Sequence, residues 1–117
     1  VPGSATQRAL LAAGSSDTVR SRVYSGKPAR LLKTRWTQAW TAQDAPAPLP
    51  MPLQNLLVSE AHARIAQSAD PDVVAMPVGQ IVGRMNRVRP VAEVFDDLLT
   101  ELTATLDRLA RLRAQDL

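Results

Sequence analysis

"SSDTVRSRVYSGKPARLLKTRW", residues 15–36, passes through three local patterns in succession, and the fold expected of the first third of this 117-residue chain depends on them. Its valines and tyrosine, separated by polar residues, predict a short extended segment. "SGKP" then predicts a turn, because Gly26 can take a positive φ and Pro28 suits the first turn of a helix. We therefore expect an extended piece, a turn and a helix in that order.

A helix is predicted for "ARLLKTRWTQAW", residues 29–40. Leu32, Trp36 and Trp40 lie four residues apart, so they would share one face of that helix. In this interpretation "SGKPAR" is the helix start. The two tryptophans would be among the few large units of the core, since only 3% of the residues are aromatic.

The segment before this stretch predicts another helix. "SATQRALLAAG" is consistent with a helix from about Ala5 to Ala13, because Ser4 can serve as its N-cap and Gly14 as its stop. We expect this helix to pack against the extended piece that follows it.

A proline-rich connection follows residue 45. Four prolines within residues 46–52 exclude both a helix and a central strand, and they predict a stiff, extended connection. A docking site for a proline-reading domain is the alternative. We place residues 1–45 before this connection and residues 53–117 after it, in one domain or part of a domain overall.

A second long helix is predicted after the connection, from Leu53 to Ala69. Its buried face is expected to consist of apolar residues at helical spacing, with "ADPD" as its end. These expected core positions are Leu56, Leu57, Ala61 and Ile65.

"MPVGQIVGRM", residues 76–85, is an apolar run that carries two glycines and one uncharged amide. Glycine is used where φ is positive or where another group approaches the main chain closely, so Gly79 and Gly83 mark an open backbone. Two interpretations stay open at this point: a buried turn in which Gln80 bonds to nearby backbone, or a turn that faces a ligand.

The closing helix is predicted to begin after Pro90 and to reach about Arg113. Apolar residues recur at spacings of three and four, which gives a helix on the order of 35 Å long with one apolar face. Such a face needs a partner surface. Its members are Val91, Val94, Phe95, Leu98, Leu102, Leu106 and Leu109.

Composition excludes several classes of protein and site. The chain has no cysteine, which excludes disulfides, thiolate metal sites and a cysteine nucleophile within it. No apolar run approaches the roughly 18 residues of a membrane span, so we expect no membrane contact and a cytoplasmic location. The net charge is +3, with a basic first third, and we expect that charge to meet acidic groups of the same protein rather than nucleic acid.

The chain lacks a complete catalytic constellation. His62 is the only histidine and is expected to lie in the middle of a helix in a structural role. Asp96 and Asp97 would project about 100° apart on a helix, so they do not converge. We assign no catalytic residue and no metal ligand to these residues.

The order of motifs resembles the C-terminal portion of the nitronate monooxygenase (2-nitropropane dioxygenase) family. The segments that carry the resemblance are "SSDTVRSRVYSGKPARLLKTRW", "PLPMPLQNLL", "PVGQIVG" and the long closing helix, and related flavin-dependent enoyl-acyl-carrier-protein reductases share that order. The resemblance implies an α/β fold, the FMN-binding TIM barrel. The segment itself should be mostly α-helical with one or two short extended pieces.

The resemblance also implies which residues matter. Gly79 and Gln80 match the family's "GQ" turn and are the candidates for contact with FMN. Ser25, Gly26 and Arg30 match its "SG-x-PAR" signature, which we interpret first as a helix start and second as a substrate contact. The family's FMN phosphate loops and catalytic histidine precede this region, so we expect the isolated segment neither to hold FMN tightly nor to turn over.

The leading functional hypothesis is therefore the C-terminal portion of an FMN-dependent oxidoreductase that oxidises nitronates or similar small substrates with an acidic carbon. The alternatives are an NAD(P)H-dependent flavin reductase of the same superfamily, acting on an enoyl or quinone substrate, and a non-catalytic basic helical interaction module. The partners expected are a small-molecule substrate and the remainder of the barrel, in cis or as a separate chain, and a homodimer stays open.

Overall fold

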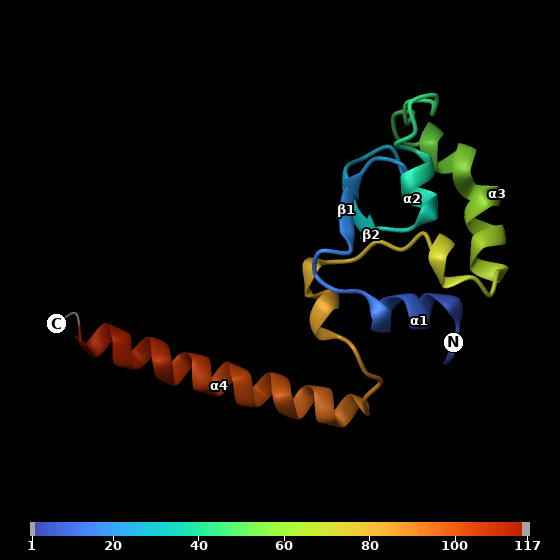
Figure 1. Ribbon diagram of the computed structural model, residues 1–117. Helices are drawn as coiled ribbons and strands as arrows, with labels where there is room; N and C mark the ends of the chain where they lie inside the picture. Colours follow the sequence, from blue (N-terminus) through green and yellow to red (C-terminus); the bar gives the residue numbers. More distant parts are fainter. Residues whose placement is uncertain (1, 116–117) are drawn as a thin grey trace. The chain divides into compact units, whose positions relative to one another are not determined.

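The computed structural model describes residues 2–115, and the chain divides between Arg87 and Val88 into two compact units (Figure 1). About half of the chain is helical. The first unit contains α1 (Ala5–Ala12), β1 (Thr18–Ser21), β2 (Ala29–Leu32), α2 (Arg35–Ala39), α3 (Leu53–Gln67) and the short 3₁₀ helices η1 (Pro71–Val73) and η2 (Gln80–Arg84). The second unit contains α4 (Val91–Gln115).

A small antiparallel sheet lies at the centre of the first unit. β1 pairs with β2, so that Val19 lies opposite Leu31. On its other edge β2 pairs with residues 76–78, through an isolated bridge between Leu31 and Pro77. Leu31 is therefore paired on both edges of its strand, and its exposed fraction is 0%. The extended segment expected around Val19, Val23 and Tyr24 is confirmed in part by β1, which ends at Ser21, before Val23.

The helix predicted over residues 29–40 is wrong for its first half. Residues Ala29–Leu32 form β2, and only Arg35–Ala39 form a helix, α2. "SGKPAR" is therefore a turn leading into a strand, and Pro28 precedes that strand instead of opening a helix. The physical reason is long-range: β2 gains backbone partners from both β1 and residues 76–78, and spacing within residues 29–40 cannot reveal these.

The turn at Gly26 is confirmed, with a φ of 92°. A Cβ added at this position would lie 2.6 Å from the carbonyl oxygen of Leu49 and 2.7 Å from the carbonyl carbon of Pro50. The proline-rich segment thus passes directly over Gly26, and glycine is required there both for its φ and for the close approach.

The proline-rich segment is also held by Gln54, at the start of α3. The side-chain oxygen of Gln54 accepts a hydrogen bond from the backbone N–H of Leu49 (2.9 Å), and its amide nitrogen donates to the carbonyl of Val23 (2.9 Å). Gln54 has an exposed fraction of 0%. The connection predicted over residues 46–52 contains neither helix nor strand and ends in a turn at Met51 and Pro52. The hydrogen bonds of Gln54 tie it to the loop after β1.

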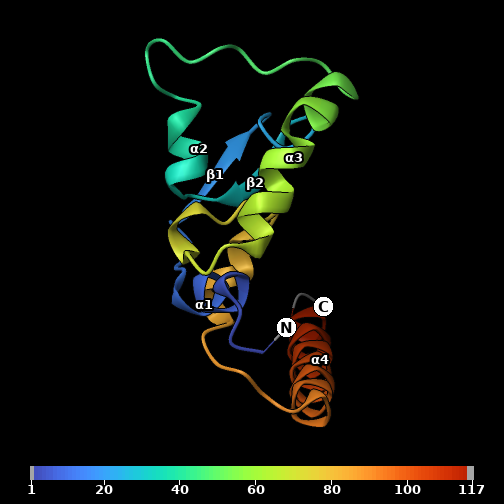
Figure 2. The same ribbon diagram turned by 90° about the vertical axis from the view of Figure 1, so that its right-hand side faces the viewer.

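The helices predicted to start at Ala5 and at Leu53 are confirmed in position by α1 and α3. Ser4 caps α1 by accepting from the backbone N–H of Gln7 (3.2 Å). The predicted core face of α3 is wrong at Leu56 and Leu57, which are 66% and 60% exposed, whereas Ala61 and Ile65 are half-buried. The buried residues of α3 are Gln54 and Val58. Figure 1 shows α3 next to α2, and in Figure 2 the strands β1 and β2 appear between the two helices. The rings of Trp36 and His62 join these helices.

The closing helix α4 is confirmed, with 25 residues. None of its described residues is buried. Arg89, just before α4, forms ion pairs with Glu93 and Asp97. The hydrogen bond to Asp97, and after it the one to Glu93, raises the pKa of Arg89 above its usual value. No helix among residues 2–115 combines the length and hydropathy needed to cross a bilayer.

Candidate functional site

The "GQ" turn begins where the third extended segment ends. The backbone N–H of Val78 donates to the carbonyl of Arg30 (3.0 Å), and the N–H of Leu32 donates to the carbonyl of Met76 (3.0 Å). Gly79 follows directly and caps η2, which begins at Gln80. The two motifs singled out in the sequence, far apart along the chain, are therefore joined by backbone hydrogen bonds.

The two glycines of this segment serve different purposes. A Cβ on Gly83 would collide with the backbone and hydroxyl of Ser15, so Gly83 is required by the close packing of η2 against the loop after α1. A Cβ on Gly79 would meet nothing closer than Ile81, at 3.6 Å, and its φ is −96°. Packing within residues 2–115 therefore explains why residue 83 is a glycine. It does not explain the glycine at residue 79, where the position of a Cβ would be free.

Gln80 lies on the open side of the chain. It is exposed, and its side-chain amide makes no hydrogen bond to residues 2–115. The first interpretation, a buried turn in which Gln80 bonds to nearby backbone, is therefore wrong. An amide held at the start of η2 can donate and accept hydrogen bonds with a bound group.

The "SG-x-PAR" residues are bonded inside the first unit. Ser25 accepts from the N–H of Lys27 (3.4 Å), and Gly26 donates to the carbonyl of Arg22 (2.8 Å). The guanidinium of Arg30 donates to the hydroxyl of Thr18 (2.9 Å), across the strand pair. These contacts give the three predicted residues structural roles in the turn and in β2, and Arg30 also lies beside the "GQ" turn through its backbone.

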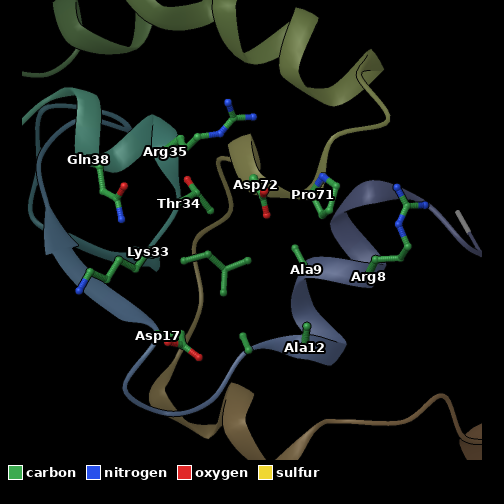
Figure 3. A pocket seen from close by; sticks show the side chains of 12 residues that line it. Arg8, Ala9, Ala12, Asp17, Lys33, Thr34, Arg35, Gln38, Pro71 and Asp72 are labelled. Carbon is green, nitrogen blue, oxygen red and sulfur yellow. The ribbon is translucent and has the colours of Figure 1, made fainter.

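A cavity of about 500 Å³ lies elsewhere in the first unit, between α1, the end of β2, α2 and η1 (Figure 3). Neither Gly79 nor Gln80 lines it. Thr34 at its edge is fixed by donating to the carbonyl of Val74 (3.1 Å), and Arg35 is paired with Asp70. Its lining consists of Arg8, Ala9, Ala12, Ala13, Asp17, Leu32, Lys33, Thr34, Arg35, Gln38, Pro71 and Asp72.

An aromatic cluster joins α2, α3 and the loop after β1. The ring of His62 stacks on Tyr24 with centroids 4.9 Å apart, and Trp36 meets the same imidazole edge to face at 5.5 Å. Burial lowers the pKa of His62 below its usual 6.5. The mid-helix position predicted for His62 is confirmed. Its partners lie far away in the sequence, so no local signal could have found the cluster.

The residues of the "GQ" turn fit a flavin in two respects. Gly79 leaves room for a flat ring to approach the main chain, and Gln80 offers an unbonded amide at that place. The described residues include no group of three or more acidic or histidine side chains that could hold a metal ion.

Comparison with known proteins gives two matches. The sequence model of the family described as "Nitronate monooxygenase" matches residues 3–101, which include both motifs. "Putative monooxygenase Rv1533" of Mycobacterium tuberculosis is 46% identical over 109 residues, covering 88% of this chain. The match spans only 29% of that relative's length. No solved structure gives a significant match.

Proposed function

The chain belongs to the nitronate monooxygenase family, and from this membership we propose that it acts as the C-terminal portion of an FMN-dependent oxidoreductase that oxidises nitronates or similar small substrates with an acidic carbon. The observation that carries the proposal is the union of the two family motifs: Val78, just before the "GQ" turn, bonds to Arg30 of "SG-x-PAR". The family is a TIM-barrel family whose members are generally flavin-dependent.

In this function the residues of the chain position the flavin and the substrate and shield them from water, and they do not react themselves. When bound, the flavin supplies a ring that takes up an electron or a hydride from the substrate. Gly79 leaves the main chain open to a flat group, and the amide of Gln80 bonds to it or to the substrate. The pairing of Val78 with Arg30 and the packing of Gly83 on Ser15 hold the turn in place.

The remainder of the barrel is the partner that this function requires, in cis or as a separate chain. The relative that matches is more than three times as long as the matched region, which supports a larger functional unit. The outer face of α3 supplies an apolar surface for that partner. Its exposed members, together with those of the proline-rich segment, are Leu49, Met51, Leu53, Leu56 and Leu57.

The test is made on the longest natural reading frame that contains these residues. Flavin content is measured from the visible absorption band, and turnover from oxygen uptake with an alkyl nitronate. We expect Gln80→Ala to lower kcat/KM roughly fivefold, because one hydrogen bond contributes about 1 kcal/mol. Gln43→Ala, at an exposed glutamine outside the turn, is the matched control and should leave kcat/KM unchanged.

Three results would count against the proposal. Purified protein without flavin and without nitronate-dependent oxygen uptake would favour a non-catalytic interaction module. NAD(P)H oxidation with an enoyl or quinone substrate, in place of nitronate oxidation, would assign the chain to the reductase alternative. Equal flavin content and turnover in wild type and Gln80→Ala would return the "GQ" turn to a purely structural role. The isolated 117 residues should bind no stoichiometric flavin.

A further inference from the structure

Two arginines face each other across the strand pair. In the register of β1 and β2, Arg20 lies directly opposite Arg30, so their side chains leave the same face of the sheet. The N–H of Lys33 donates to the carbonyl of Asp17 (2.9 Å), which makes these two a hydrogen-bonded pair. Because such pairs alternate with non-hydrogen-bonded ones, the two arginines form a non-hydrogen-bonded pair, in which opposite Cα atoms are only about 4.5 Å apart. Like charges in this position destabilise a strand pair.

Neither arginine has an acidic partner within residues 2–115. Arg20 is exposed, and its guanidinium makes no hydrogen bond or ion pair to the described residues. The guanidinium of half-buried Arg30 donates to the hydroxyl of Thr18 (2.9 Å), which carries no charge. The one acid among the first 43 residues is Asp17, and its carboxylate accepts from the N–H of Gly14 (2.8 Å). Two positive charges therefore lie side by side without a counter-charge from this part of the chain.

The arginine pair lies beside the "GQ" turn. On the other edge of β2 the carbonyl of Arg30 accepts from the N–H of Val78 (3.0 Å), and the turn begins at the next residue. Thr18, which holds the guanidinium of Arg30, donates to the carbonyl of Ser15 (3.3 Å). Ser15 is in turn the residue against which Gly83 of η2 packs. Both the backbone and the side chain of Arg30 are thus tied to the segment that forms the turn.

We propose that Arg20 and Arg30 bind the phosphate group of a ligand held at the "GQ" turn. A guanidinium presents several N–H donors in one plane, which matches the oxygens of a phosphate. A phosphate monoester carries a charge of about −1.5 to −2 at neutral pH, so it balances both arginines, whereas a carboxylate leaves one of them uncompensated. The inference rests on the proposed function, which puts a ligand at this turn, and it gives that ligand a charge and a chemical class.

The phosphate has two possible sources, FMN itself or a phosphorylated substrate with an acidic carbon. The family's FMN phosphate loops precede this region, which favours the substrate. Both sources require the same two guanidinium groups, so the first experiment tests the arginine pair and a second identifies the source.

The first experiment uses the protein encoded by the longest natural reading frame that contains these residues. Its melting temperature is measured in rising concentrations of inorganic phosphate at constant ionic strength, because a ligand that binds the folded state stabilises it. Wild type should melt at higher temperature as phosphate rises. Arg20→Gln, which removes an exposed side chain without partners in the described residues, should raise the Kd for phosphate roughly tenfold or more.

Lys33→Gln is the matched control. It removes the same charge beyond the end of β2, where Lys33 lines the cavity of Figure 3, and it should leave the Kd for phosphate unchanged. Arg20→Glu is a second variant with two readouts. It sets opposite charges across the strands, so it should raise the melting temperature without phosphate by about 1–2 °C and abolish the rise that phosphate causes. A pair with a purely structural role would give only the first of these changes.

The source of the phosphate is identified on the flavin-free form of the same protein, from the Kd values of FMN and riboflavin measured by flavin fluorescence. A roughly tenfold loss of the preference for FMN in Arg20→Gln would assign the phosphate to the flavin. An unchanged preference would assign it to the substrate, with which inorganic phosphate should then compete.

Two results would overturn the inference. An absent rise in wild type, or an equal rise in wild type and Arg20→Gln, would leave the arginines to carboxylates in the remainder of the barrel. Loss of the rise in Lys33→Gln alone would move the phosphate to the cavity. Neither result depends on turnover, so failure of the proposed function itself is detected separately, by the absence of flavin and of nitronate-dependent oxygen uptake.

Discussion

Removing the side chain of Gln54 should destabilise the first unit more than any exposed substitution on α3. Gln54→Ala deletes the acceptor for the N–H of Leu49 and the donor to the carbonyl of Val23. The two backbone groups differ in their access to water: Leu49 is 40% exposed and Val23 is 0% exposed. The lost hydrogen bond to the buried carbonyl of Val23 should therefore cost more stability than the one to the N–H of Leu49.

The expected magnitude follows from that difference. A buried polar group left without a partner costs about 1–3 kcal/mol, and a group that water can reach costs about 1 kcal/mol or less. Gln54→Ala should thus lower the free energy of unfolding by about 1 to 4 kcal/mol. Since whole domains are stable by only about 5–15 kcal/mol, this is a large part of the total.

Urea unfolding followed by tryptophan fluorescence measures this effect on the first unit alone, because Trp36 and Trp40 are the only tryptophans and both lie in it. Gln67→Ala, at the exposed last residue of α3, is the control and should change the free energy by less than about 0.5 kcal/mol. If Gln54→Ala costs no more than Gln67→Ala, the hydrogen bonds of Gln54 do not hold the proline-rich segment and the reasoning fails.

Two further predictions use the same assay. Gly83→Ala should destabilise the first unit by about 1–3 kcal/mol, because its Cβ would collide with Ser15, whereas Gly79→Ala should be nearly neutral; equal losses would show that packing does not separate the two glycines. For His62, burial puts the folded-state pKa below the unfolded value of about 6.5, so the folded state binds fewer protons. Its contribution to stability is therefore present above about pH 6.5 and lost as the pH falls through the folded-state pKa, and His62→Phe should remove that slope; an identical slope in wild type and variant would contradict this.

The sequence predicted the helices that depend on neighbours a few residues apart. Ser4 was recognised as a cap, and the spacing of apolar residues located α4 from Val91 onward. The "GQ" turn was also identified from the sequence, but what distinguishes its glycines was not. Gly83 is required by Ser15, which lies far away along the chain, so only the packed structure separates it from Gly79.

Failures of sequence reasoning have a common cause. β2 was predicted as a helix because Leu32, Trp36 and Trp40 are spaced four apart, yet its backbone is paired on both edges with distant segments. Two of the four apolar residues assigned to the core face of α3, Leu56 and Leu57, are exposed, and the buried positions of this helix include a glutamine, Gln54. Gln54 is tolerated there because Val23, 31 residues earlier, accepts its hydrogen bond.

Capping and apolar periodicity act within about four residues, and for that reason the sequence by itself determined α1, the extent of α3 and the long amphipathic helix α4. The tertiary structure alone decided that Ala29–Leu32 is a strand, that the proline-rich segment is held over Gly26, and that "SG-x-PAR" and the "GQ" turn are hydrogen-bonded neighbours. Each of these depends on backbone partners brought together from distant parts of the chain, and no local pattern encodes such partners.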